Sequence, residues 1–208
     1  PFLDFNHASV VAFSARYISP EMSDKEKAIA LYYGVRDDIR YNPYSFNVTE
    51  ESFQASHCAQ AKESYCVPKA LLLVALARLN GIPSRLGLAD VKNHLSSPAL
   101  IEWLQNDEFV MHGYADIYID GKWVKATPAF NRSLCEKMNS EPLEFNGEVD
   151  SIFQEFTEEG HKHMEYLNDW GTFAELPLEF IKMNLNKHYP HLLNKVDRGD
   201  LAPAMETE

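Results

Sequence analysis

One segment of this chain is apolar on every side, and it limits the folds open to the protein. Residues 70–77 are eight consecutive apolar residues, and Arg78 follows them. A membrane-spanning helix needs about 20 such residues, so the run is too short to cross a bilayer. Pro68 suits the first turn of a helix, and Gly81 suits the position just after its end. We therefore predict a helix between them that is buried on all sides in a soluble protein.

The overall composition is that of a globular protein. Of the 208 residues, 45% are apolar and 24% are charged, and there are nine Gly, eleven Pro and three Cys. This length is enough for one sizeable core, and these counts exclude collagen-like, low-complexity and disulfide-scaffold proteins. No repeat and no Gly/Ser linker divides the sequence. We therefore expect a single domain over residues 1–208.

Charge and cysteine content bear on partners and compartment. Nineteen basic and 31 acidic residues give a net charge of −12. An acidic surface repels phosphate groups, so we expect neither nucleic acid nor an anionic membrane as a partner. The odd number of Cys favours a reducing environment, and residues 1–16 lack the basic start of a secretory signal. These features predict a cytoplasmic protein.

Three further helices are predicted. Ser23 and Glu26 form a capping box, and apolar residues follow at helical spacing to about residue 41. Pro98 begins a short helix that runs to residue 104. Residues 176–193 contain an amphipathic helix that breaks before Pro190.

A β-hairpin is predicted in the middle of the chain. Residues 109–119 are rich in β-branched and aromatic residues, residues 120 and 121 are the Asp-Gly pair of a two-residue turn, and residues 122–127 return. Residues 82–89 resemble a turn into another strand. Residues 1–20 and 130–176 show no clear pattern, and residues 44–65 look irregular apart from a short helix near residues 50–54.

Cys66 lies at the start of the apolar helix. The first backbone N–H groups of a helix are unpaired and carry partial positive charge, which favours ionisation of a thiol. A thiolate is a strong nucleophile. The alternative is that Cys66 is a small buried residue that happens to precede a helix.

The hairpin register places a histidine and a threonine on the same face. With the turn at residues 120 and 121, Asp116 lies opposite Lys125 and His112 lies opposite Ala129. His112 and Thr127 then become diagonal neighbours, so that Thr127 could orient the imidazole. Asp116 is about 13 Å along the strand from His112 and is expected to pair with Lys125.

These pieces together resemble the transglutaminase-like superfamily. Residues 79–85 read Leu-Asn-Gly-Ile-Pro-Ser-Arg after the Cys66 helix, similar to the family's Gly-Ile-Pro-x-Arg type segment. Residues 112–123 run from His112 through an aromatic and acidic stretch to a Gly-Lys-Trp turn. The family usually has Asp before Pro as its third residue, and Thr127 stands at that position, before Pro128. The resemblance covers about residues 24–130.

The resemblance implies an α+β, papain-like fold in which the Cys66 helix packs on an antiparallel sheet. The resemblance does not cover the rest of the chain. We expect a partly helical C-terminal extension at about residues 131–195 and a frayed tail at residues 196–208. The resemblance also implies a thiol hydrolase or acyltransferase: Cys66 attacks an amide and forms a thioester, and His112 acts as acid and base. Gln60, six residues before Cys66, resembles an oxyanion donor in spacing, although a surface role is as consistent.

Three functions remain open from the sequence. The leading hypothesis is a thiol-dependent amide or peptide hydrolase or acyltransferase without cofactor, acting on a protein, peptide or small amide. Because Thr127 is uncharged, it would stabilise an imidazolium less than Asp, and a chain that only binds peptide in the cleft is the alternative. A plain interaction domain is the third.

The remaining candidates are interpreted as structural. His161 and His163 are expected on a polar surface turn rather than around a metal. Cys58, beside His57, lacks the second close Cys pair of a zinc site, and Cys135 is expected to be a passive thiol. The rings of three further residues are expected in the core, with a groove lining as the alternative: Tyr114, Tyr118 and Trp123.

Overall fold

The computed structural model describes residues 1–153 and 163–197. The α-helices are α1 (Ala8–Ser14), α2 (Asp24–Asp38), α3 (Ala55–Gln60), α4 (Cys66–Leu79), α5 (Pro98–Leu104), α6 (Arg132–Lys137), α7 (Leu178–His188) and α8 (Pro190–Asp197). The strands are β1 (Arg40–Tyr41), β2 (Glu63–Ser64), β3 (Ser84–Asn93), β4 (Glu108–Ile119), β5 (Lys122–Ala126) and β6 (Met164–Phe173). Two short 3-10 helices are η1 (Pro43–Ser45) and η2 (Glu51–Phe53).

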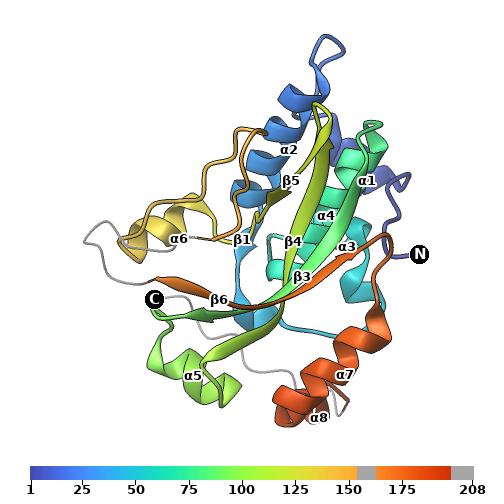
Figure 1. Ribbon diagram of the computed structural model, residues 1–208. Coiled ribbons are helices and arrows are strands. Elements are labelled where there is room, and N and C mark those ends of the chain that lie inside the picture. Colours follow the sequence, from blue (N-terminus) through green and yellow to red (C-terminus); the bar gives the residue numbers. More distant parts are fainter. Residues whose placement is uncertain (154–162, 198–208) are drawn as a thin grey trace.

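The fold is a curled antiparallel sheet with helices packed on one face. The strand order in this sheet is β5-β4-β3-β6, and β1 and β2 form a separate small parallel pair. Helices α1 to α4 lie behind the sheet in Figure 1, whereas α5, α7 and α8 gather at its lower end. The predicted α+β class, with the Cys helix on an antiparallel sheet, is confirmed.

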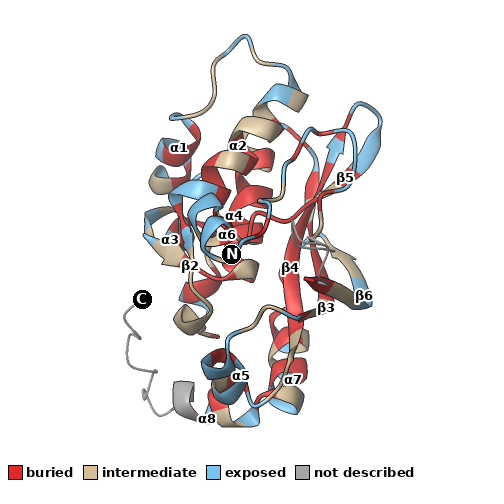
Figure 2. Cartoon of the chain, turned by 90° about the vertical axis from the view of Figure 1, so that its left-hand side faces the viewer, coloured by how far each residue is buried: buried red, intermediate tan, exposed pale blue. Residues whose placement is uncertain are grey.

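Helix α4 is the centre of the core, as the apolar run predicts. Every residue from Val67 to Ala77 is buried, and the helix packs against β4 and β3 on one side and against α1, α2 and α3 on the other. Figure 2 shows it enclosed between the sheet and the other helices. Gly81 follows with a φ of 79°, the left-handed conformation that ends a helix. Among the described residues, no helix is long and apolar enough to span a bilayer.

The local signals for α2, α5 and the hairpin are confirmed. Ser23 and Glu26 make both hydrogen bonds of the capping box, and Ser97 caps α5. The register pairs Asp116 with Lys125 and Ile119 with Lys122, as predicted. The predicted pairing does not continue to His112, however, because the last pair is Ala115 with Ala126. Beyond it the chain leaves β4, and the Thr127 amide donates to the carbonyl of Ser151 at 2.8 Å.

Several elements were missed by the sequence patterns. Helices α1, α3 and α6 have seven residues or fewer, which is too short to show helical periodicity. Most residues of strand β6 are half-exposed or exposed, so its sequence lacks the alternation of apolar and polar residues that marks a strand. It nevertheless pairs along β3 at the edge of the sheet, because main-chain hydrogen bonds do not depend on the side chains. The C-terminal helix breaks at Tyr189, and Pro190 begins α8.

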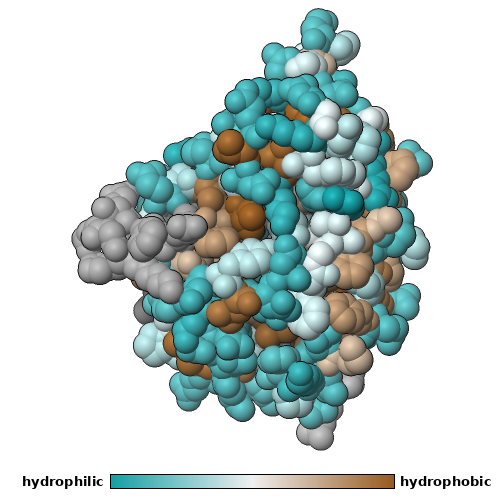
Figure 3. All heavy atoms as spheres, in the orientation of Figure 1, coloured by the Kyte–Doolittle hydropathy of each residue, from teal (hydrophilic) through white to brown (hydrophobic). Residues whose placement is uncertain are grey.

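Side chains on the outer face of the sheet correct two predictions. Tyr118 and Trp123 are each 40% exposed rather than in the core, and Arg85 lies over the Trp123 ring. The Asp116 carboxylate pairs with Arg85 at 2.8 Å, not with Lys125, although the backbone register is as predicted. Figure 3 shows this face as a mixture of hydrophilic and hydrophobic residues. Tyr114 is buried, as expected.

Candidate active site

Cys66 is the first residue of α4, where the backbone amides point out of the helix. Its side chain is half-buried. Loss of hydration on burial raises the pKa of the Cys66 thiol to about 11, whereas the backbone N–H groups of Gly113, Val67 and Cys66 itself act to lower it. Burial is the larger effect, so the resting thiol is protonated at neutral pH.

His112 lies on β4 just after an irregularity in the strand. Val110 and Met111 together oppose Asp90 of β3, which is a β-bulge, and Met111 adopts a φ of 61°. The Met111 amide donates to the Asp90 carboxylate at 3.0 Å, which holds this uncommon conformation. Burial lowers the pKa of His112 to about 4, so the imidazole is neutral at pH 7.

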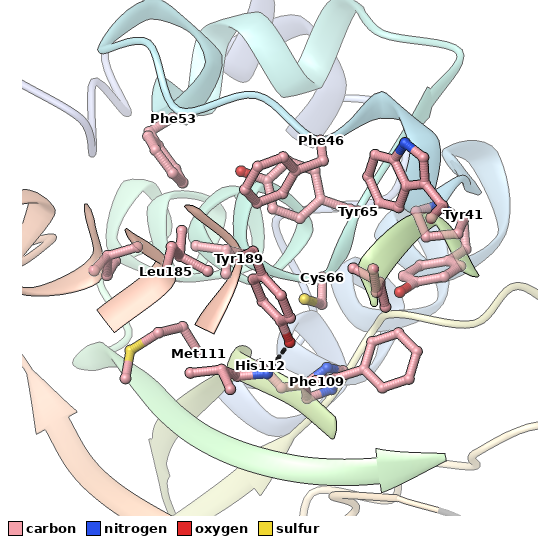
Figure 4. Close-up of a pocket in the computed structure, with 16 residues that line it drawn as sticks. Tyr41, Phe46, Phe53, Tyr65, Cys66, Phe109, Met111, His112, Leu185 and Tyr189 are labelled. Atoms are coloured by element: carbon pink, nitrogen blue, oxygen red, sulfur yellow. Dashed lines mark hydrogen bonds between the residues drawn. The ribbon is translucent and has the colours of Figure 1, made fainter. Parts of the chain in front are cut away.

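A close approach of β4 to the start of α4 brings these two residues together. A Cβ placed on Gly113 would lie 2.8 Å from the Cα of Val67 and 3.3 Å from the carbonyl oxygen of Cys66. Only a glycine therefore fits between the strand and the helix without a shift. Cys66 and His112 line one cavity, and Figure 4 shows their side chains in it, one from the helix and one from the strand.

Tyr189, between α7 and α8, ties the C-terminal helices to the strand that carries His112. Its hydroxyl accepts a hydrogen bond from the Val110 amide at 2.8 Å and donates to the carbonyl of Glu108. Val110 is one of the two residues of the bulge and Glu108 lies two residues before it, so the Tyr189 hydroxyl holds this part of β4. The dashed line in Figure 4 marks the bond to Val110. The C-terminal extension thus forms one wall of the cavity.

Thr127 is buried, and its hydroxyl makes no direct hydrogen bond to the imidazole of His112. Its hydroxyl has no hydrogen-bond partner among the described residues, and His112 makes no side-chain hydrogen bond with them either. The two residues do line a second, small cavity of about 10 Å³. They fail to meet directly because the chain leaves the hairpin after Ala126. The side-chain oxygen of Asn131 accepts a hydrogen bond from the Tyr41 amide at 2.8 Å, and Tyr41 lines the cavity beside Cys66.

Gln60 is not placed as an oxyanion donor. It is exposed at the end of α3, and its amide nitrogen donates to the Ser56 carbonyl at 2.9 Å. It is not among the residues that line the cavity with Cys66. The six-residue spacing was misleading because residues 55–60 form a helix that directs this side chain along its own axis.

The other candidate residues lie outside this site. His163 is buried rather than on a surface turn, its ring stacks on Phe130, and burial lowers its pKa to about 4. His161 lies outside the described residues. Within the described parts of the chain, no three His, Cys, Asp or Glu side chains come together as a metal-ligand set. Cys58 and Cys135 are buried and form no disulfide, and burial raises the pKa of Cys58 to about 12.

The cavity beside Cys66, which we call the apolar chamber, is lined mainly by aromatic and aliphatic side chains. Its volume is about 50 Å³. The aromatic residues that line it are Tyr41, Phe46, Phe53, Tyr65, Trp103, Phe109 and Tyr189. The aliphatic lining includes Leu104, Met111, Ile181 and Leu185. Figure 4 shows most of these side chains around Cys66.

Comparison with known families identifies the group to which the chain belongs. The model of the transglutaminase-like superfamily matches residues 11–128, which is more than half of the sequence. The chain belongs to the transglutaminase-like superfamily. The match contains Cys66, His112 and Thr127, and it ends close to the boundary that the sequence resemblance predicted.

Two solved structures resemble this superfamily member. One is described as a candidate cysteine protease from Cytophaga hutchinsonii, with a TM-score of 0.46, 18% identity, and coverage of 61% of this chain and 38% of that one. The other is described as a candidate protease from Parabacteroides distasonis, with a TM-score of 0.40, 15% identity, and coverage of 56% and 22%. The chain thus matches well under two thirds of either structure's length. No curated protein matches the sequence.

In this transglutaminase-like chain, the sequence alone assigned no role to three residues around the site: Asp90, Gly113 and Tyr189. Gly113 carried a signal, because a glycine inside a strand often marks a close backbone approach. Asp90 and Tyr189 carried none that a single sequence reveals. They bond to backbone amides of a bulge, and a bulge becomes visible only when the partner strands are known.

We predict that Gly113→Ala destabilises the protein and disturbs the site. The new methyl group meets backbone rather than a flexible side chain, so β4 and α4 must separate. We expect a loss of about 1–3 kcal/mol in the free energy of unfolding, measured in urea. Alkylation of Cys66 should change as well, because the Gly113 amide contributes to the environment of the thiol. Unchanged stability and alkylation would show that the close approach is not needed.

A second prediction concerns Thr127→Asp. A carboxylate in the small cavity would favour a charged His112 and raise its pKa above the present value of about 4. An imidazolium near the thiolate would in turn lower the pKa of Cys66 from about 11. Because alkylation requires the thiolate, the pH profile of iodoacetamide labelling should move to lower pH, with at least about tenfold faster labelling at pH 7.

The matched control for this experiment is Thr127→Asn, which has nearly the same shape as Asp but no charge. Its profile should stay close to that of the unmodified protein. If a folded Thr127→Asp protein and the Asn control give the same profile, residue 127 has no electrostatic influence on the pair.

Proposed function

We propose that this protein is a thiol-dependent amide hydrolase or acyltransferase that works through a thioester on Cys66. The observation that carries the proposal is the placement of a helix-start cysteine and a strand histidine on one cavity, held there by the close approach at Gly113. Membership of the transglutaminase-like superfamily supports thiol hydrolase or transferase chemistry in general.

The proposed first step uses the two neutral side chains. His112 is uncharged at pH 7 and can accept the thiol proton as the sulfur of Cys66 attacks the substrate carbonyl. The carbon–sulfur bond forms, and the carbonyl oxygen gains negative charge next to the amides at the start of α4. The carbon–nitrogen bond then breaks, and the imidazolium returns its proton to the leaving amine.

The second step releases the acyl group. His112 takes a proton from water or from an amine, which attacks the thioester carbonyl, and the sulfur leaves and is reprotonated. Water yields a carboxylic acid, and an amine yields a new amide. A protein, a peptide or a small amide is the proposed substrate.

Trapping of the acyl-enzyme tests this function. We expect p-nitrophenyl acetate to place one acetyl group on Cys66, located by mass spectrometry of peptides, and hydroxylamine to remove it as the hydroxamate. Denatured protein is the control for unselective labelling of thiols. Labelling of Cys66 only after denaturation would contradict the proposal.

A peptide-binding protein without turnover is the second candidate. It is favoured by the raised thiol pKa and by the lack of a described side chain that orients His112. This alternative predicts that the native protein forms no acyl adduct on Cys66, and the same trapping experiment separates the two functions.

A further inference from the structure

We propose that the apolar chamber selects a short aliphatic acyl group, with about two to four carbons beyond the carbonyl. This proposal rests on the proposed function, because the chamber receives the part of the substrate attached to the carbonyl that Cys66 attacks. Cys66 and His112 form part of its wall, so a thioester formed on Cys66 has its acyl chain beside the chamber.

The lining offers no charged side chain at pH 7 and few unpaired hydrogen-bonding groups. Among the described residues that line the chamber there is no Asp, Glu, Lys or Arg, and His112 is neutral at pH 7. The Tyr65 hydroxyl is occupied by the Asn47 carbonyl at 2.7 Å. The Tyr189 hydroxyl is occupied by Val110 and Glu108. The indole N–H of Trp103 is buried without a hydrogen-bond partner among the described residues, but one neutral donor does not replace the hydration of a carboxylate or carboxamide.

Volume sets the upper limit of the group. The chamber holds about 50 Å³. A single water needs about 10–15 Å³ on this scale, and a cavity that takes a benzene ring is about 150 Å³. The chamber therefore fits a chain of a few carbons, whereas a phenyl group requires the aromatic walls to move.

Helix α7 forms a wall of the chamber where a substitution can change the size of the acyl group that fits. Leu185 is buried and faces the chamber, and Figure 4 shows it beside Tyr189. Met183 lies on the same helix but is 62% exposed and does not line the chamber, so it is a matched control position.

The experiment compares p-nitrophenyl esters of acetic, butyric, succinic and benzoic acids. The rate of acylation of Cys66 is divided by the rate for N-acetylcysteine, which removes differences in chemical reactivity. We expect butyryl to exceed acetyl by about tenfold, since two more methylenes are buried, and to exceed succinyl and benzoyl by more than that.

Variants at position 185 test whether the acyl group binds in the chamber beside α7. Leu185→Phe should abolish the preference for butyryl over acetyl, and Leu185→Ala should move the preference to longer chains. Met183→Phe should keep the original order. If the Leu185 variants do not fold, the series of esters on the unmodified protein still decides the question.

The outcomes separate this inference from the proposed function. If no ester acylates Cys66 in the native protein, the proposed function fails and this inference fails with it. If Cys66 is acylated but the corrected rates are equal, or succinyl or benzoyl is preferred, the inference alone is overturned. An unchanged order in folded Leu185 variants would also overturn it.

Discussion

Replacing Cys66 with Ala is expected to eliminate acyl-enzyme formation and to lower kcat/KM for any amide or ester substrate by about 10⁴-fold or more. A loss of this size is expected because, in nucleophilic catalysis, removing the nucleophile abolishes almost all of the rate acceleration that the site provides. Cys66 is half-buried and small, so we expect the fold to survive. Turnover by the purified variant and its circular dichroism spectrum are the two measurements.

Two further variants make this result specific. Cys66→Ser keeps the size of the side chain but supplies a much weaker nucleophile, so it should also be inactive. Cys135→Ala removes a buried thiol that does not line the chamber, and it should retain activity in the fraction that folds. Full activity in Cys66→Ala would place the chemistry elsewhere in the protein.

Replacing Lys69 with Met is expected to destabilise the protein by more than about 3 kcal/mol. Lys69 is completely buried one turn after Cys66, and its ammonium donates to the carbonyls of Arg36, Ile39 and Ala129. These three bonds join α4 to the end of α2 and to the segment that follows Thr127. Methionine fills a similar volume but leaves three buried carbonyls unsatisfied, each costing about 1–3 kcal/mol.

The pH dependence of this difference tests whether the buried amino group of Lys69 is its source. Burial lowers the pKa of Lys69 to about 7, below its value of about 10.4 in an unfolded chain. Between these values the unfolded chain binds more protons, so the contribution of Lys69 to the free energy of unfolding rises with pH. The Met variant lacks this slope. Denaturation in urea at pH 7 and pH 9.5 measures it, and equal differences of under 1 kcal/mol at both pH values would contradict the role assigned to Lys69.

The geometry also explains why a neutral pair is expected in the resting protein. Both Cys66 and His112 lose hydration, which disfavours the thiolate and the imidazolium alike. With a thiol pKa of about 11, only about one molecule in 10⁴ carries the thiolate at pH 7. The family usually has Asp at the position of Thr127, and its negative charge would stabilise the imidazolium. Thr127 is uncharged and supplies no such compensation.

The sequence by itself determined the elements whose signals are local. The apolar run predicted α4, the capping box at Ser23 predicted α2, and the Asp-Gly turn predicted the register of β4 with β5. Cys66 and His112 could also be named as candidates in advance, from the helix start, the strand position and the resemblance to the superfamily, and both line the chamber. These predictions succeed because helix caps, tight turns and apolar periodicity depend on residues close together in the chain.

Only the tertiary structure decided how these elements meet. The chain leaves the hairpin after Ala126 to bond with Ser151, so Thr127 and His112 share a cavity but no hydrogen bond. Tyr189 lies 77 positions after His112 in the chain, yet its hydroxyl bonds to the Val110 amide in the bulge that precedes His112. The partners of exposed backbone groups and the walls of the chamber lie far apart in the chain, and packing around α4 alone brings them together.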